Sequence, residues 1–149
     1  IRSINQRLHE PIPRIELGIA LRGFASAGID ISDGLLGDLR HILKASDVSA
    51  EIWLDLLPVS CILQEQQSHI RRQCAAAGGD DYELCFTAPQ CHRSRIQEIS
   101  HDLDIPLTRI GQLVNNKRIA PNMTLLDQDG KALDTELTNS LLQSFDHFK

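Results

Sequence analysis

The sequence predicts an α/β fold, more closely an α+β arrangement in which helices pack on a mixed sheet. Strand-like and helix-like segments alternate along the chain, no continuous strand–helix–strand pattern of a parallel sheet is present, and a hairpin pattern lies near the end. The chain has 149 residues, of which 42% are hydrophobic and 23% charged. This length and composition are typical of one globular domain with a buried core.

The most informative stretch, residues 27–39, reads as a short strand that turns into a helix. Ile29 and Ile31 alternate as in a strand, and Asp33-Gly34 is a dipeptide typical of a turn. Aliphatic residues then recur at helical spacing, and the helix is expected to end near residues 45–46. The residues that form this apolar stripe are Leu35, Leu36, Leu39, Ile42 and Leu43.

Asp30, Ser32 and Asp33 crowd this junction, and two interpretations are open. In the first, Asp33 or Ser32 caps the helix by accepting a backbone N–H hydrogen bond worth about 1 kcal/mol, which leaves Asp30 unexplained. In the second, two carboxylates and a hydroxyl offer hard oxygen ligands to a Mg²⁺ ion that carries nucleotide phosphates. Spacing alone favours the cap, because Asp-rich turns before helices are common, and the two roles are compatible.

The remaining elements follow from proline, glycine and periodicity. Residues 1–14 are expected to be an incoming linker, because Pro11 and Pro13 break any helix, and residues 15–149 then form the domain. Strands are expected at 51–56, 82–87 and 107–114, and a hairpin at 123–133. Helices are expected at 15–25, 59–77, around Ile96, Ile99 and Leu103, and around Leu137, Leu141 and Phe145.

Composition argues against several classes of protein. The net charge of −5 and the lack of a dense basic run give no expectation of nucleic-acid binding. No apolar run approaches the roughly 20 residues that cross a membrane, and no signal peptide is recognised. Four cysteines without a C-x-x-C pair are expected to be thiols in a reducing cytoplasm. Because the first residue is Ile1 instead of Met, the chain is expected to begin inside a longer protein.

Three segments together resemble a known family. Residues 28–35, Gly-Ile-Asp-Ile-Ser-Asp-Gly-Leu, are similar to the D-x-S-D-G-L signature that opens the second domain of bacterial thiamine-monophosphate kinases. Residues 78–84 resemble the family's G-G-E-D-Y-E-L, and residues 145–148 resemble its closing aromatic-D-H-F. The similarity covers the C-terminal half of that family. The wider aminoimidazole-ribonucleotide synthetase-like superfamily shares the fold but not this trio of segments.

The resemblance implies a C-terminal domain of that superfamily, whose dimerising N-terminal domain, absent here, carries most of the nucleotide contacts. It implies a kinase that uses ATP and Mg²⁺ to convert thiamine monophosphate to thiamine diphosphate, and a homodimer formed through the N-terminal domain. By the same resemblance, Asp30 and Asp33 would hold Mg²⁺, Asp30 and Ser32 would contact the nucleotide, and Asp80 and Phe145 would hold thiamine monophosphate.

The residues alone leave alternatives open. Without the resemblance, the Gly-Gly-Asp-Asp run at 78–81 is a polar turn, and Phe145 at helical spacing is typical of a core. Asp80 stands where the family has Glu, which shortens its reach by about one methylene. No catalytic nucleophile is expected, since phosphoryl transfer depends on positioning and charge neutralisation, and the fragment alone is expected to be inactive. Two functions compete with that of the kinase: another ATP-dependent enzyme of the superfamily, and a non-enzymatic binding or interaction module.

Overall fold

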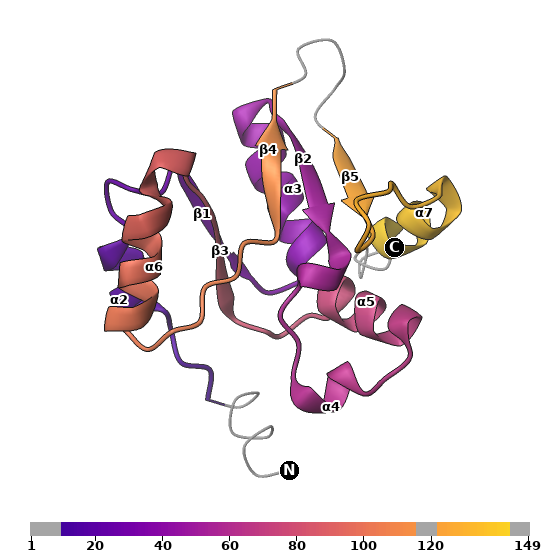
Figure 1. The fold of residues 1–149 in the computed structure, drawn as a ribbon, viewed down its shortest axis with the longest axis horizontal. Coiled ribbons are helices and arrows are strands. Elements are labelled where there is room, and N and C mark those ends of the chain that lie inside the picture. Colours follow the sequence, from indigo (N-terminus) through magenta and orange to yellow (C-terminus); the bar gives the residue numbers. More distant parts are fainter. Residues whose placement is uncertain (1–9, 116–121, 144–149) are drawn as a thin grey trace.

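The computed structural model describes residues 10–115 and 122–143. Within these ranges no helix combines the length and the apolar character needed to cross a bilayer. The elements, shown in Figure 1, are α2 (Ile15–Ala20), β1 (Ala27–Ile31), α3 (Leu35–Ser46), β2 (Ser49–Trp53), the 3-10 turn η1 (Leu54–Leu56), α4 (Cys61–Gln64), α5 (Ser68–Ala77), β3 (Glu83–Thr87), the 3-10 turn η2 (Gln90–His92), α6 (Arg93–Asp102), β4 (Gly111–Val114), β5 (Met123–Leu126) and α7 (Thr135–Gln143).

The strands form two small sheets. β1 pairs with β3 antiparallel, so that Ala27 lies opposite Thr87 and Ile31 opposite Glu83. β2 is the central strand of the other sheet, antiparallel to β4 and parallel to β5. The mixed pairing and the helices packed against it confirm the predicted α+β class. The division into two sheets was not part of the prediction.

The β1–β3 pair separates two hydrophobic clusters. Because side chains alternate across a strand, Ile29 and Cys85 pack on the α3 side, in the cluster that extends to the three-stranded sheet. Leu84 and Phe86 pack on the opposite side, against the buried Leu17 of α2 and Ile99 of α6. Figure 1 shows α2 and α6 together over this ribbon, at the left of the molecule. The ribbon that carries the junction is therefore covered on both faces.

Helix α3 is the main helix of the larger cluster. All five members of the predicted apolar stripe are buried, and each aliphatic side chain contributes up to about 1.5–3 kcal/mol. The helix ends at Ser46, as the sequence predicted, and Asp47 follows with the left-handed conformation typical of a helix C-terminus (φ 52°).

The predicted cap of α3 is wrong. Gly34 occupies the N-cap position with φ 112°, and no side chain accepts a hydrogen bond there, so neither Ser32 nor Asp33 caps the helix. The chain turns from β1 into α3 through a positive φ that glycine adopts at little cost.

A different carboxylate, that of Asp38, organises the turn. Asp38 lies on the buried face of α3 and is only 7% exposed. Its Oδ2 accepts hydrogen bonds from the backbone N–H groups of Ser32, at 2.9 Å, and Asp33, at 3.3 Å. One buried oxygen of Asp38 therefore holds two consecutive residues of the junction.

The same carboxylate lies near the Cys85 thiol of β3. Burial, together with the nearby charge of Asp38, raises the pKa of this thiol to about 11.

Four expected elements need correction. The two strands among them are shorter than expected, because sheet pairing ends before the apolar pattern does. The strand predicted at 51–56 is β2 only as far as Trp53, after which Leu54–Leu56 form η1. The strand predicted at 107–114 begins only at Gly111, which pairs with Ile52 at one end of the β2–β4 ladder. The helix predicted at 59–77 is interrupted between α4 and α5, and the helix predicted at 15–25 ends at Ala20.

Other expectations agree with the described residues. The hairpin is present as β5, a turn at 127–130 and a single antiparallel bridge between Leu126 and Ala132. Residues 10–14 contain no helix or strand, while residues 1–9 of the expected linker lie outside the described residues. The division of the chain at residue 14 therefore stays a prediction. Phe145 also lies outside the described residues, so the last turn of the final helix stays a prediction too.

An ion pair fixes α5, the helix that leads into the second signature segment. The Arg72 guanidinium donates two hydrogen bonds to Asp55 of η1, at 3.0 Å and 2.6 Å. Arg71 lies 3.8 Å from the same carboxylate. The hydrogen bond from Arg72 is the main reason that the pKa of Asp55 lies below its ordinary value. The bidentate pair ties α5 to the three-stranded sheet and so orients the loop that follows it.

We expect Asp38→Ala to lower the free energy of unfolding by about 1–3 kcal/mol, because two N–H groups lose their acceptor. Asp38→Asn keeps an acceptor oxygen and should cost less. Urea denaturation measures both effects. Asp102→Ala, an exposed control on α6, should change stability by about 0.5 kcal/mol or less. A fully stable Asp38→Ala variant would remove Asp38 as the organiser of the turn.

Asp55→Asn should lower the free energy of unfolding at neutral pH by roughly 1.5–3 kcal/mol, the range for hydrogen bonds to charged groups. Arg72 lowers the pKa of Asp55 from 3.8, so the contribution of the pair is complete above that value and is lost as pH falls through the lowered pKa. The difference between wild type and variant should therefore shrink in acid. Denaturation at several pH values tests this, with exposed Asp104→Asn as the control, and a difference independent of pH would contradict it.

Candidate active site

The junction after β1 presents three oxygen-bearing side chains. Asp30 belongs to β1, opposite Leu84 of β3, and its carboxylate is exposed. Ser32 and Asp33 follow the strand, Ser32 half-buried and Asp33 exposed. The Ser32 hydroxyl lies 3.4 Å from Asp33 Oδ1, a long contact that leaves both groups available. The predicted metal ligands and nucleotide contacts therefore lie within four residues, at the end of β1 and in the turn that follows it.

The second signature segment lies directly against this turn. The Asp80 N–H donates to the Ser32 carbonyl at 2.8 Å, and the Tyr82 N–H donates to the Ile31 carbonyl at 2.8 Å. Gly79 permits the approach, because a Cβ at that position would lie 3.0 Å from the Ser32 carbonyl oxygen. Two stretches about fifty residues apart in the sequence are thus joined by their backbones.

The loop that carries Asp80 is held in an unusual conformation. Asp80 and Tyr82 both have left-handed backbones, with φ of 64° and 51°. Asp adopts this region readily, whereas an aromatic residue does so rarely, and such outliers cluster at ligand sites. The Tyr82 hydroxyl donates to Asp80 Oδ1 at 3.1 Å. This hydrogen bond and the negative charge of Asp80, with a smaller effect of Asp33, raise the pKa of Tyr82.

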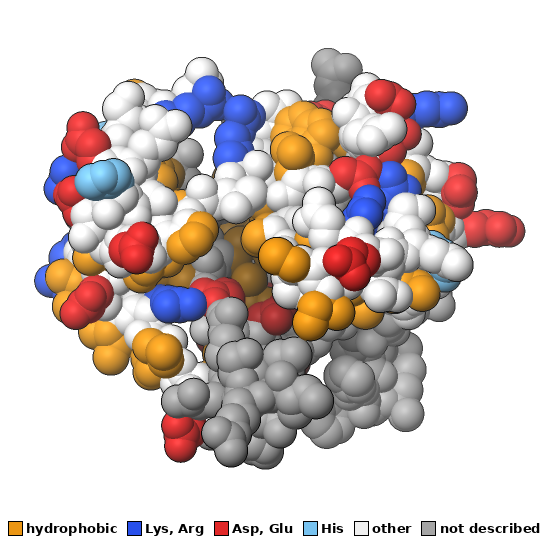
Figure 2. Space-filling model, turned by 60° about the horizontal axis from the view of Figure 1, so that its bottom comes forward, with side chains coloured by type: hydrophobic (Ala, Val, Ile, Leu, Met, Phe, Trp, Pro, Cys, Tyr) orange, Lys and Arg blue, Asp and Glu red, His pale blue; other side chains and the backbone are white. Residues whose placement is uncertain are grey.

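A cavity of about 340 Å³ opens beside Asp30. Tyr82 and Leu84 line it on the β3 side, and Pro11, Pro13, Arg14 and Ile15 line it on the other side. Arg14 fixes that second wall, since its guanidinium donates to both Glu83 oxygens, at 2.7 and 2.8 Å, and this raises the pKa of Arg14. Figure 2 shows a face hollowed near its centre, with hydrophobic side chains around the hollow and acidic side chains at its edge.

The donor set of the junction fits Mg²⁺ better than a closed metal centre. Among the described residues, no group of three or more His, Cys, Asp or Glu side chains is arranged to hold a metal ion. Two carboxylates suit Mg²⁺, which keeps water and phosphate oxygens as its remaining ligands. They do not suit structural zinc, which requires four protein ligands. The assignment of Asp30 and Asp33 to a metal stays a prediction.

The structure brings four of the five predicted site residues into two contacting loops: Asp30, Ser32, Asp33 and Asp80. The fifth, Phe145, lies outside the described residues. Sequence reasoning missed the organising role of Asp38, although one signal was available. Asp38 stands three residues after Leu35 and four before Ile42, an acid within an apolar stripe. The contacts of Tyr82 and Arg14 had no comparable signal.

Comparisons with known proteins agree with these segments, although no family model matches the chain. Thiamine-monophosphate kinase of Haemophilus influenzae is 41% identical over 147 residues, which cover 98% of this chain and 43% of that protein. The thiamine-monophosphate kinase of Escherichia coli K12 is 48% identical over 106 residues, which cover 69% of this chain and 32% of that protein.

Solved structures give the same result. Thiamine-monophosphate kinase from Stenotrophomonas maltophilia K279a superposes with a TM-score of 0.74 and 43% identity, over 88% of this chain and 40% of that one. AaThiL complexed with AMPPCP and TMP superposes with a TM-score of 0.64 and 29% identity, over 89% of this chain and 39% of that one.

The chain thus spans less than half the length of the curated relatives that it matches. The match lies in their C-terminal part and includes the two contacting loops. The chain belongs to the thiamine-monophosphate kinase family, of which it represents the C-terminal part.

Proposed function

We propose that this chain is the C-terminal part of a kinase that uses ATP and Mg²⁺ to phosphorylate thiamine monophosphate, which gives thiamine diphosphate. The observation that carries the proposal is the contact between the two signature loops, in which Asp80 N–H donates to the Ser32 carbonyl. This contact joins the loop that carries Asp80 to the turn that carries Ser32 and Asp33, directly after Asp30, which lines a cavity. The relatives bear the name of this activity, and one related structure is complexed with AMPPCP and TMP.

The proposed chemistry requires positioning and charge neutralisation more than a nucleophile. Asp30 and Asp33 would hold Mg²⁺, and Asp30 and Ser32 would contact the nucleotide. The metal ion, when bound, neutralises negative charge on the phosphates. The chain's own task is to hold the backbone that carries these oxygens. Asp38 holds the N–H groups of Ser32 and Asp33, and Gly79 permits the close approach of the second loop to Ser32. An acidic turn that binds anionic phosphates needs such a cation between them.

Asp80 and Phe145 are the proposed contacts to thiamine monophosphate. The side chain of Asp80 is anchored by Tyr82, and its left-handed backbone suits Asp better than the Glu of the family pattern. The loop geometry therefore offers a reason for the departure from that pattern. Phe145 enters the proposal through the family resemblance alone.

The part of the relatives that this chain does not span is the proposed source of the other contacts. We infer that an N-terminal domain supplies most of the nucleotide site and the homodimer interface, and that the protein works in the cytoplasm. The chain alone is then expected to lack kinase activity, because one acidic turn cannot complete the site.

The double variant Asp30→Asn/Asp33→Asn in the full-length protein is expected to lower kcat by a factor on the order of 10² or more, because it removes the charges that face Mg²⁺. Stability should change by about 1 kcal/mol or less, since both side chains are exposed and neither caps α3. Steady-state kinetics and urea denaturation measure the two effects.

The matched control is Asp102→Asn/Asp104→Asn, which removes the same charge from exposed positions at the end of α6. It should leave kcat unchanged. Equal losses in both double variants would indicate an effect of net charge, and near wild-type activity in the first would exclude the metal role.

Asp80→Asn should raise the KM for thiamine monophosphate several-fold and leave the KM for ATP near its wild-type value. Asn keeps the size of the side chain and tolerates the left-handed backbone, so the variant tests the charge and not the fold. Steady-state kinetics with each substrate varied in turn gives both constants. Asp129→Asn, in the exposed turn of the hairpin, is the control. A rise in both KM values, or in neither, would exclude Asp80 as a specific contact to thiamine monophosphate.

A further inference from the structure

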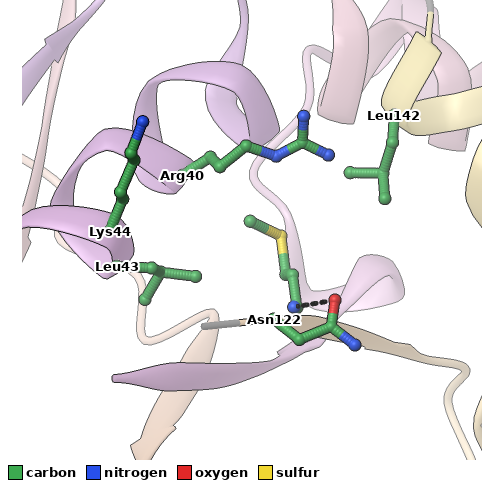
Figure 3. A pocket seen from close by; sticks show the side chains of 6 residues that line it. Arg40, Leu43, Lys44, Asn122 and Leu142 are labelled. Atoms are coloured by element: carbon green, nitrogen blue, oxygen red, sulfur yellow. Dashed lines mark hydrogen bonds between the residues drawn. The ribbon is translucent and has the colours of Figure 1, made fainter. Parts of the chain in front are cut away.

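A second cavity, of about 280 Å³, lies between α3 and the segment that leads through β5 to α7. Six residues line it: Arg40, Leu43, Lys44, Asn122, Met123 and Leu142 (Figure 3). None of these residues lines the cavity beside Asp30. Arg40 and Lys44 lie in the second and third turns of α3, away from the junction at its N-terminus. The cavity is therefore a separate feature of the molecule.

Two cationic side chains line the cavity without a counter-ion among the residues that the structure describes. Arg40 and Lys44 stand four residues apart on α3 and so share one side of the helix. Both are exposed, and neither forms a hydrogen bond or ion pair with the residues that the structure describes. No acidic side chain is among the lining residues. In Figure 3 the Arg40 side chain extends across the cavity toward Leu142, while Lys44 extends outward at its edge.

The Asn122 side chain at the wall of the cavity is fixed in direction. Its side-chain Oδ1 accepts a hydrogen bond from the Met123 N–H at 2.8 Å, drawn as the dashed line in Figure 3. Because a backbone N–H can only donate, the amide oxygen must face it. The Asn122 NH₂ group therefore points the other way, and in Figure 3 it lies on the side of Asn122 away from Arg40. The Asn122 backbone is itself held by a hydrogen bond to Ser49 Oγ at 3.1 Å.

The other lining residues are apolar. Leu43 is 2% and Met123 5% exposed, and Leu142 is half-buried, so they form a hydrophobic wall at the edge of the larger cluster. A guanidinium and an ammonium beside such a wall match an anion with an apolar substituent. The guanidinium fork favours a phosphate, whose oxygens it can bind in pairs. The volume lies at the small end of the range for ligand pockets.

We propose that this cavity binds a small organic phosphate monoester. The phosphate group contacts the Arg40 guanidinium, with Lys44 as a second positive charge. The organic part lies against Leu43, Met123 and Leu142. The site is independent of the kinase proposal, because it shares no residue with the turn that carries Asp30 and Asp33.

The test uses ¹⁵N-labelled protein titrated with phenyl phosphate and, separately, with inorganic phosphate, in EDTA. Without divalent cations the acidic turn at residues 30–33 repels phosphate, so binding there does not interfere. We expect saturable shifts of the Leu43 and Met123 amide signals, with phenyl phosphate bound several-fold more tightly than inorganic phosphate because of the apolar wall. Arg40→Ala/Lys44→Ala should weaken binding tenfold or more.

The charge-matched control is Arg22→Ala/Arg93→Ala, at exposed positions of the α2–α6 part of the fold. It should bind phenyl phosphate as the wild type does. Three results would overturn the proposal: no saturable shift at Leu43 and Met123, equal weakening in the two double variants, or equal affinity for the two probes. An inactive kinase with an intact phenyl phosphate titration would contradict the proposed function alone.

Discussion

The buried carboxylate of Asp38 is the interaction on which the candidate site depends. A carboxylate at 7% exposure is costly unless it is hydrogen-bonded, and Asp38 meets this need by accepting from two consecutive N–H groups. The same hydrogen bonds satisfy the N–H groups of Ser32 and Asp33, which follow β1 and are not paired in the β1–β3 ladder. Because α3 carries Asp38 among its buried leucines, the packing of the core sets the position of the turn. Stability and site geometry are thus coupled through one side chain.

The second loop is held by different forces. Its backbone is bonded to the end of β1, its start is fixed by α5 through the Arg72–Asp55 pair, and its end continues into β3 beside Arg14. These restraints impose the left-handed conformations of Asp80 and Tyr82. Such strain persists only where the surroundings determine it fully. The loop is therefore a constructed feature, and its direct contact with the first turn makes the two signature segments one unit.

Charge is distributed unevenly over the molecule. The chain carries a net charge of −5, and three acidic side chains, Asp30, Asp33 and Asp80, belong to the two contacting loops. Arg40 and Lys44, on the same helix that begins at those loops, stand without a counter-ion among the described residues. An acidic site recruits phosphate only with a metal cation, whereas a basic cavity binds it directly. The turn before α3 would therefore need a metal cation to bind phosphate, whereas Arg40 and Lys44, further along the helix, would not.

The sequence by itself determined the elements whose pattern is local. The strand at Ile29 and Ile31, the stripe of α3 and the turn at Asp33-Gly34 follow from alternation, helical period and glycine, and the signature segments identified the family. The tertiary structure decided everything that depends on distant partners. β2 stops at Trp53 because its pairing stops there, and Ser32 and Asp33 are held by Asp38 instead of capping α3. Asp80 meets Ser32 because β1 and β3 pair antiparallel, a long-range register that no local pattern encodes.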